Sequence, residues 1–532
     1  MLFAIGATAF LGMAGLATQA GLWYADYADM QTAADSASMA GAVAIAASET
    51  TTQATASATY VLKQNGYVNN QGGVTVTVHT PPTSGTFKNN AHAVEVVLAK
   101  TASLNVAGLF MASAPTFSVR SVAVYGANAA TCMLALGQDL GGSNNGHFAL
   151  SGGASIHASG CALATNSTST EAFYIEPSPQ VTADTIVSSG GVTSSCGQGP
   201  TGCGSTLTLN QPYSSYHVPS TDPLAAVQNV TLPSSSDFSP ASSCSGTPQT
   251  VSFPQWNSTA SMQSGCYAAL TVPGTNTISF PSGGGSYTFT GDVNLGGVSS
   301  ISGGASAVTA ASTISISGAL NLTNYNASQL PPGTYYIGNG MNISSSAATS
   351  VAYSNIPSTF YINGNLTLSG SAQVDIPPGT YFINDGNLNV GNGTTLSCSS
   401  CVAGGAGVTF VLMGDHPGIV NVSGSAPVTF SAPASSNYDS GFDGIAIYEV
   451  PGDSGTNLLQ GSGTLNVQGA IYLPGAALSI SGGAGSSVTC AVFVANTITM
   501  SGSGYATDNS CGQYGYGWAT AGPTPNGVTL AE

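Results

Sequence analysis

Basic residues are almost absent from this chain of 532 residues. It has 4 Lys and Arg against 21 Asp and Glu, and charged residues make up 5% of the total, whereas about 25% is usual for a globular protein. No Lys or Arg occurs from Ser121 to Glu532. A surface without cations offers phosphate groups no countercharge, which argues against nucleic acid as a partner.

Cysteine is absent before Cys132, which is the first of ten. The cysteines come as near neighbours along the chain, which predicts local disulfides formed in an oxidising compartment outside the cytoplasm. The expected pairs are Cys132 with Cys161, Cys196 with Cys203, Cys244 with Cys266, Cys398 with Cys401, and Cys490 with Cys511. The rival interpretation, free or metal-bound thiols, has only the Cys398-Ser-Ser-Cys401 spacing in its favour.

Sequence patterns of known catalytic chemistry are also missing. The histidines form no HExxH motif or paired His/Cys spacing, no glycine-rich stretch leads into a phosphate-loop lysine, and no nucleophile elbow has a His partner in order. A polysaccharide lyase needs a strong base, usually Arg or Lys, and the chain after Arg120 has neither. We therefore expect that the chain is not an enzyme. A Ca²⁺-dependent, polysaccharide-acting β-helix enzyme is the least favoured alternative.

One group of carboxylates is dense enough to be considered as a cation site. Asp439, Asp443, Glu449 and Asp453 surround an expected strand at 444–448. Clustered carboxylate oxygens suit Ca²⁺, so these four residues are a candidate calcium site. Solvated carboxylates on turns are the alternative interpretation, and no other cofactor is expected.

The first residues form an apolar stretch without charge. Residues 2–22 would span roughly 30 Å as a helix, the thickness of a bilayer core. Tyr24 and Tyr27 follow, as aromatic residues do at a membrane interface. We therefore expect a transmembrane or pilin-like helix over 1–24 that anchors the chain in the inner membrane. A signal peptide is the rival interpretation, but it would carry basic residues before a shorter apolar run.

The helix is expected to continue beyond the membrane. Small side chains share one of its faces, at Ala33, Ala37, Ala40, Gly41 and Ala44. A face of small residues permits close approach of another helix or a sheet. Two interpretations stay open: packing against the chain's own head domain, or assembly with other pilus or filament subunits.

A small α+β domain is expected over 25–128. A second helix is predicted at 52–65, and three segments that alternate apolar and polar residues predict strands at 74–78, 93–98 and 117–125. A long helix followed by a small antiparallel sheet is the layout of a pilin-like module.

Recurring turns predict a parallel β-helix, or solenoid, over 129–515. Leu330-Pro-Pro-Gly-Thr-Tyr-Tyr-Ile returns as Ile376-Pro-Pro-Gly-Thr-Tyr-Phe-Ile, and Tyr336-Ile-Gly-Asn-Gly aligns with Tyr361-Ile-Asn-Gly-Asn. Coils of this kind bury their apolar rows by stacking on one another. Residues 196–285 carry no clear repeat and are expected to form an irregular insert, and 516–532 a tail. The predicted class is thus mainly β; an antiparallel sandwich is the rival.

Tyrosines of these turns suggest a second function. Tyr335, Tyr336, Tyr361 and Tyr381 would lie at matching positions of successive coils. On an exposed face they would stack on sugars, which would make the chain a surface adhesin or carbohydrate-binding module. The alternative is that their rings fill the core or form a ladder between coils.

The sequence also resembles a known family. Leu11-Gly-Met-Ala-Gly, Leu22-Trp-Tyr and Met30-Gln-Thr-Ala-Ala-Asp-Ser-Ala-Ser-Met-Ala-Gly-Ala resemble the N-terminal signature of the tight adherence (Tad) pilus-assembly proteins, TadE/TadG-like branch. Cys132-Met-Leu-Ala-Leu, the Pro-Pro-Gly-Thr-Tyr turns and Ala491-Val-Phe-Val-Ala-Asn resemble the β-helical extracellular part of such proteins.

The resemblance implies a structural component of a bacterial pilus or cell-surface filament. It implies a location at the cell surface or in the periplasm, with partners in the membrane or among other filament subunits, including further copies of this chain. It implies pilus biogenesis and surface adherence, with no established catalysis.

Overall fold

The computed structural model divides into two compact units, one formed by residues 1–128 with 524–532 and the other by 129–523. The described residues are 2–46, 49–85, 87–91, 93–109, 111–125, 130–138, 147–195, 197–198, 206–211, 213–215, 219–296, 300–302, 311–323, 330–345, 356–371, 373–391, 393–402, 404–452, 455–461, 465–482, 490–502, 505–507 and 528–530. The side chains of residues 2–12 are not among them.

The first unit, called the head, is an α+β fold. Its sheet is antiparallel in the order β1-β2-β3-β37. The elements are α1 (Leu2–Ala46), α2 (Thr51–Gln64), β1 (Val74–His79), β2 (Ala93–Thr101), the 3₁₀ turn η1 (Asn105–Leu109), β3 (Thr116–Tyr125) and β37 (Val528–Leu530). The residues expected to form a tail thus contribute a strand, and the second unit is inserted in the chain between β3 and β37.

Helix α1 covers the head sheet with its C-terminal half. Met30 and Ala34 are fully buried there, in one cluster with Val96 and Leu98 of β2. Helix α2 begins with a capping box, in which the Thr50 side chain accepts from the Gln53 amide and Gln53 reaches back to Thr50. Among the described residues, no helix is long and apolar enough to cross a membrane.

The second unit is a parallel β-solenoid, which confirms the predicted mainly β class with an N-terminal helix. Its coils contribute strands to three ladders. The first ladder, in stacking order, is β13 (Gly265–Tyr267), β16 (Ser286–Phe289), β19 (Ser312–Ile316), β21 (Gly333–Ile337), β23 (Ser358–Asn363), β26 (Gly379–Asn384), β29 (Val408–Met413), β32 (Ile445–Glu449), β34 (Leu465–Gly482), β35 (Cys490–Met500), β4 (Ala130–Ala135), β6 (Ser155–Thr165) and β8 (Gln180–Ser188).

The second and third ladders share the long strands β34, β35, β6 and β8 with the first. Members of the second are β14 (Leu270–Val272), β17 (Val293–Gly296), β20 (Leu320–Thr323), β22 (Met341–Ser345), β24 (Leu366–Gly370), β27 (Leu388–Val390), β30 (Val420–Val422), β33 (Thr456–Gly461), β5 (Phe148–Leu150), β7 (Phe173–Ile175) and β9 (Val192–Ser194), with β10 (Gly197–Gln198) antiparallel to β9. Members of the third are β25 (Gln373–Asp375), β28 (Thr395–Ser397), β31 (Val428–Ser431), β36 (Tyr505–Thr507) and β11 (Thr206–Leu209). At the far end of the stack, β12 (Thr259–Ser261), β15 (Thr277–Ser279) and β18 (Ser300–Ser302) form a separate parallel sheet.

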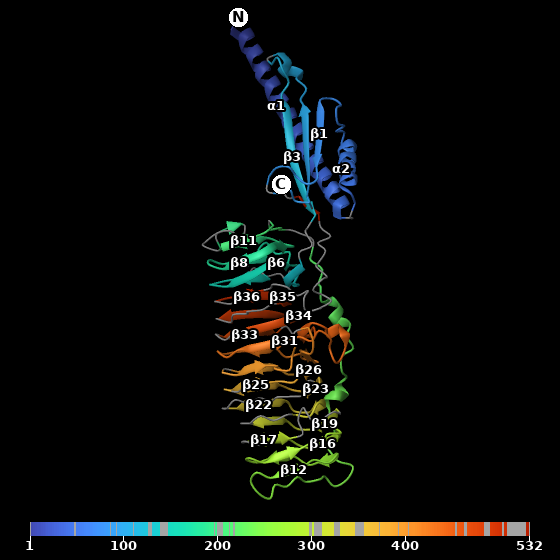
Figure 1. Cartoon of the computed structure of the whole chain (residues 1–532). Coiled ribbons are helices and arrows are strands. Elements are labelled where there is room, and N and C mark those ends of the chain that lie inside the picture. Colours follow the sequence, from blue (N-terminus) through green and yellow to red (C-terminus); the bar gives the residue numbers. More distant parts are fainter. Residues whose placement is uncertain are drawn as a thin grey trace. The chain divides into compact units, whose positions relative to one another are not determined.

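The stacking order of the coils differs from their order in the chain. The first coils run from β4 to β11, and the chain then passes to the opposite end of the stack, where β12 begins (Figure 1). From there the coils wind back until β35 pairs with β4 and β5, and β36 with β6. The stretch that joins the two ends, residues 219–258, is called the connector; it contains the 3₁₀ turns η2 (Ala225–Asn229) and η3 (Ser235–Phe238).

Each coil forms strands because apolar residues alternate with polar ones. In β21 and β23 buried and partly exposed positions alternate strictly, so one row of side chains enters the core. Tyr336 pairs with Tyr361, the alignment that the sequence predicts. Inside, the rings of Tyr335, Phe360 and Tyr381 stack with centroids 4.5 and 4.4 Å apart.

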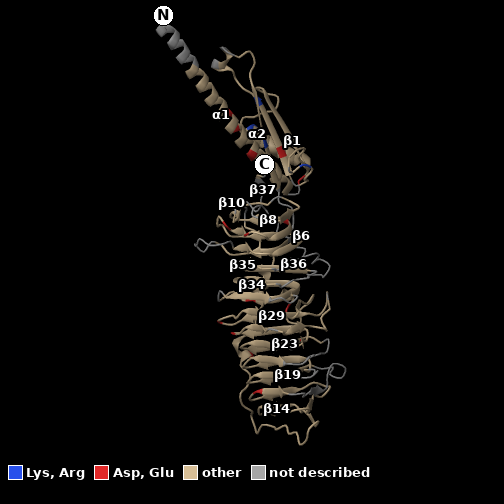
Figure 2. Cartoon of the chain, turned by 90° about the vertical axis from the view of Figure 1, so that its left-hand side faces the viewer, with Lys and Arg blue, Asp and Glu red and all other residues tan. Residues whose placement is uncertain are grey.

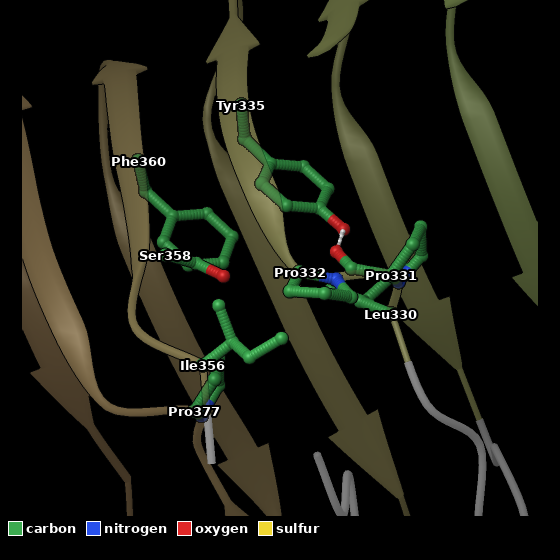
Figure 3. A pocket seen from close by; sticks show the side chains of 8 residues that line it. All are labelled: Leu330, Pro331, Pro332, Tyr335, Ile356, Ser358, Phe360 and Pro377. Carbon is green, nitrogen blue, oxygen red and sulfur yellow. Dashed lines mark hydrogen bonds between the residues drawn. The ribbon is translucent and has the colours of Figure 1, made fainter. Parts of the chain in front are cut away.

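Each of the two Pro-Pro-Gly-Thr-Tyr turns holds its own tyrosine ring in place through a hydrogen bond. The Tyr335 hydroxyl donates to the Pro331 carbonyl of its own turn (Figure 3). The Tyr381 hydroxyl makes the same contact in its own turn and donates to the Pro377 carbonyl at 3.0 Å. A buried hydroxyl is thereby satisfied without water. Only glycine fits at Gly333, because φ is +155° and a Cβ would lie 1.9 Å from the Ser312 carbonyl oxygen.

Candidate functional site

The outer side of the first ladder carries an aromatic row. Tyr336, Tyr361 and Phe382 occupy matching outward positions of β21, β23 and β26, with ring centroids 5.0 and 5.4 Å apart and nearly parallel planes. Toward β34 the row continues with Val411, Tyr448 and Tyr472. Such a row would be an unusually large exposed apolar patch if nothing covered it.

The connector and a loop before β32 cover this row. Leu224, Val227 and Phe238 of the connector are buried in the same cluster as the row. The Phe238 ring meets Tyr361 edge-on at 5.9 Å, and Tyr438 of the loop meets Phe382 edge-on at 4.6 Å. Edge-to-face contacts of this kind add to the free energy of burial. The aromatic row is therefore part of a second core.

Polar contacts fix the connector along the stack. The Tyr472 hydroxyl donates to Asp222 Oδ2 at 2.7 Å, and Gln228 Nε2 donates to the same hydroxyl. Burial raises the pKa of the Asp222 carboxyl, although its hydrogen bonds from Tyr472 and the Leu224 amide oppose that shift. The side chains of Tyr472, Asp222 and Gln228 thus hydrogen-bond within the protein and hold the connector on the stack.

The structure places the four predicted tyrosines on two different sides of the first ladder. Tyr335 and Tyr381 are each 1% exposed and point into the core, so neither ring can meet a sugar. Tyr336 and Tyr361 belong to the outer row, where Phe238 packs on Tyr361. The alternative that the rings form ladders between coils describes all four residues.

The predicted calcium residues do not share a site within the described part of the chain. Asp439 Oδ1 accepts from the Gly441 amide and Asp443 Oδ1 from the Ser436 amide, each at 2.7 Å, so both close turns. Glu449 is 2% exposed and accepts from Asn457 Nδ2 at 2.6 Å. The described residues contain no group of three or more His, Cys, Asp and Glu placed to hold a metal ion, and Asp453 lies outside them.

The carboxyl of Glu449 has a strongly perturbed pKa. Burial raises its pKa to about 7, and the hydrogen bond from Asn457 only partly offsets that effect. The side-chain oxygen of the same residue, Asn457 Oδ1, accepts from the backbone amide of Val420 at 2.7 Å. Glu449 and Asn457 thus tie β32, β33 and β30 together within the fold.

Disulfide bonds are present, as the cysteine pattern predicts. Three of the expected pairs are seen, Cys132–Cys161, Cys244–Cys266 and Cys398–Cys401, and Cys490 is also disulfide-bonded. Cys196, Cys203 and Cys511 lie outside the described residues. Cys244–Cys266 joins the connector to β13, at the end of the stack that begins with β12.

The small-residue face of α1 is used within its own unit. Ala33 and Ala37 are at most 1% exposed and Ala44 is 6% exposed, whereas Ala40 is half-buried. A Cβ at Gly41 would lie 2.8 Å from Val94 Cγ1, so the helix touches β2 there. Of the two interpretations, packing against the head is the one that the structure shows for these residues.

The connector is the main feature that the sequence analysis missed, since it fell within the irregular insert. A local signal exists: Leu224 and Val227 are apolar residues three positions apart in a Ser- and Pro-rich stretch. That spacing matches one side of a helical turn. It gives no information on which surface the turn would cover.

Comparison with known proteins yields no match: no family model, no curated protein and no solved structure matches the chain. The resemblance to the tight adherence proteins therefore stays a prediction from the sequence.

Proposed function

We propose that the chain is a structural component of a bacterial pilus or surface filament, as the resemblance to tight adherence proteins implies. In this proposal the head assembles through α1 with other subunits, and the solenoid is displayed outside the cytoplasm as a rigid element without catalytic activity. The carrying observation is an exposed apolar stripe on α1.

The stripe lies on the part of α1 that precedes the buried segment. Met13 is 61% exposed, Leu16 43%, Tyr24 76% and Tyr27 43%, and Ala20 between them is also exposed. Positions i, i+3, i+7, i+11 and i+14 fall on one side of an α-helix. An apolar helical stripe of this length is unfavourable in water, and packing against a matching helix would bury it.

The solenoid supports the proposal through its covalent frame and its charge. Disulfides are favoured outside the cytoplasm, and three complete ones lie within the described part of the solenoid. The solenoid has no Lys or Arg, and its Asp and Glu are scattered along the stack, so trypsin has no site in it (Figure 2). Both properties suit a long-lived element exposed to solvent outside the cell.

The test is electron microscopy of bacteria that express the full chain, with an antibody against the solenoid. We expect label on extracellular or periplasmic assemblies, and loss of assembly in Leu16→Arg/Tyr24→Arg, which charges the stripe. Ala25→Arg is the matched control, because Ala25 is exposed on α1 but lies off the stripe.

Label confined to the cytoplasm would overturn the proposal. So would equal assembly by the stripe variant and the Ala25 control. Circular dichroism of the isolated variants checks that each retains the fold.

A further inference from the structure

The turn before β12 presents a tryptophan to solvent. Trp256 is 76% exposed, whereas large aromatic residues elsewhere in the solenoid are mostly buried in the two cores. The turn lies at the β12 end of the stack, opposite to β11 (Figure 1). Covering the exposed part of this indole with a ligand would release free energy.

The Trp256 ring rests against the backbone of the next coil. A Cβ at Gly274 would lie 2.3 Å from Cζ3 and 2.7 Å from Cε3 of Trp256, so the indole rests on the glycine backbone. Gly274 has φ of +63°, a conformation that further favours glycine. One part of the ring is therefore supported, and the rest is exposed.

Hydrogen bonds hold the turn that carries the ring. The backbone N–H of Asn257 donates to Thr275 Oγ1 at 3.2 Å, and the backbone N–H of Ser258 donates to Asn276 Oδ1 at 2.9 Å. Ser258 Oγ also donates to the Gln255 carbonyl at 2.7 Å. Such contacts reduce the entropy that a ligand would have to remove from the site.

The surroundings of the ring are polar but uncharged. Gln255 and Asn257 are exposed neighbours of Trp256, and their side-chain amides each offer donors and an acceptor. The chain has no Asp, Glu, Lys, Arg or His between Asp237 and Asp292, a stretch that includes the turn and β12 to β16. A charged ligand would find no partner from this stretch, whereas a neutral one with many hydroxyls would find several.

We propose that Trp256, with the side-chain amides of Gln255 and Asn257, forms a binding platform for a neutral polysaccharide. The C–H groups of a sugar ring carry partial positive charge and suit the electron-rich face of an indole. The sugar hydroxyls suit amides, which both donate and accept. This site is independent of the buried tyrosines and of the assembly of α1.

The experiment is calorimetric titration of the full chain with neutral oligosaccharides, namely fragments of cellulose, chitin, starch and mannan. Anionic fragments of alginate and pectin serve as comparators. We expect the chain to bind at least one neutral oligosaccharide, and Trp256→Ala to weaken that binding about tenfold or more. Trp256→Phe keeps an aromatic face and should retain part of the affinity.

Two further variants separate binding from folding. Asn257 has φ of +60°, so Asn257→Gly keeps the turn and removes only the side-chain amide; we expect binding to weaken several-fold. Tyr213→Ala is the matched control, because Tyr213 is a 41% exposed aromatic residue next to the Ser214 bridge to β8, at the other end of the stack. It should bind like the original chain.

Three results would overturn the proposal. The first is that no neutral oligosaccharide binds at millimolar concentration. The second is that Trp256→Ala binds as well as the original chain, or that Tyr213→Ala loses binding equally. The third is tighter binding of the anionic fragments, which the uncharged surroundings of the ring do not predict.

Discussion

Phe493, in the last coil of the solenoid, is the parallel-strand partner of Met133 in its first coil. Both side chains are buried, at 1% and 3% exposure, in the same core. The coils of residues 130–211 therefore stack on the last coil of the solenoid, formed by β35 and β36, and not on the coil that follows them in sequence. Their stability depends on a contact between distant residues, which forms late in folding if local contacts form first.

Phe493→Ala should uncouple the first coils from the rest of the stack. Removing a buried phenylalanine leaves a cavity and costs about 3–5 kcal/mol. Hydrogen exchange followed by mass spectrometry should show faster exchange in β4, β6 and β8. Phe289→Ala, at the β12 end, is the matched control and should leave those strands protected; equal exchange patterns in the two variants would contradict the stacking order.

The stability of the solenoid should decrease as pH rises through neutrality, because of Glu449. The folded state holds its pKa at about 7 while the unfolded value is 4.5, so the folded chain binds more protons between these values. The loss should begin near pH 4.5 and be complete above pH 7, at most about 3 kcal/mol. Chemical denaturation at pH 5 and pH 8 measures it.

Glu449→Gln should remove this pH dependence and stabilise the solenoid at pH 8. Glutamine keeps an oxygen that can accept from Asn457 but carries no charge to desolvate. Glu171→Gln, at an exposed position of the solenoid, should leave the dependence intact. A Glu449→Gln variant with the original pH dependence would show that another group is responsible.

The head should lose stability in acid through Glu95. Burial alone raises the pKa of this carboxyl, but hydrogen bonds from Thr83, Arg120 and Ser84 outweigh that effect and lower it to about 2. Its contribution is complete above about pH 4.5 and is lost as pH falls toward 2. Glu95→Gln should lower the free energy of unfolding by about 2 kcal/mol at pH 7. It should also make that free energy depend less on pH below about pH 4.5. A Glu95→Gln variant whose stability still falls in acid as much as that of the original chain would contradict this role.

Removal of the Cys244–Cys266 bond should release the connector. The cysteines are 22 residues apart, and a disulfide that closes a loop of this length restricts the unfolded chain and raises the free energy of unfolding by about 3 kcal/mol. In Cys244→Ser/Cys266→Ser we expect a protease of broad specificity to cut first within 219–258. The pair Cys398→Ser/Cys401→Ser, only 3 residues apart, should have a smaller effect and leave the connector resistant.

The parts of the fold that the sequence predicts are those with local signals. The alternation in β1, β2 and β3 marks these strands, and the recurring Tyr-Ile motif gives the register of Tyr336 on Tyr361. Each of these signals lies within one element or between neighbouring coils. Sequence periodicity reports such contacts directly.

The parts that the sequence does not predict depend on contacts between distant segments. Nothing near Phe493 indicates that β35 returns to β4, and nothing near Val528 indicates a fourth strand beside β3. The sequence analysis does not single out the Trp256 platform for the same reason. Trp256 becomes distinctive only through its contact with Gly274, which the chain brings to it from the next coil.

Mapping the cysteines in intact cells tests most directly whether the stacked, disulfide-held solenoid exists outside the cytoplasm. Cells that express the chain are alkylated before lysis, and peptides from digestion with pepsin are analysed by mass spectrometry without reduction. We predict Cys132 linked to Cys161, Cys244 to Cys266 and Cys398 to Cys401, with no alkylated cysteine among them. Alkylated thiols at these positions in the folded protein would contradict the account.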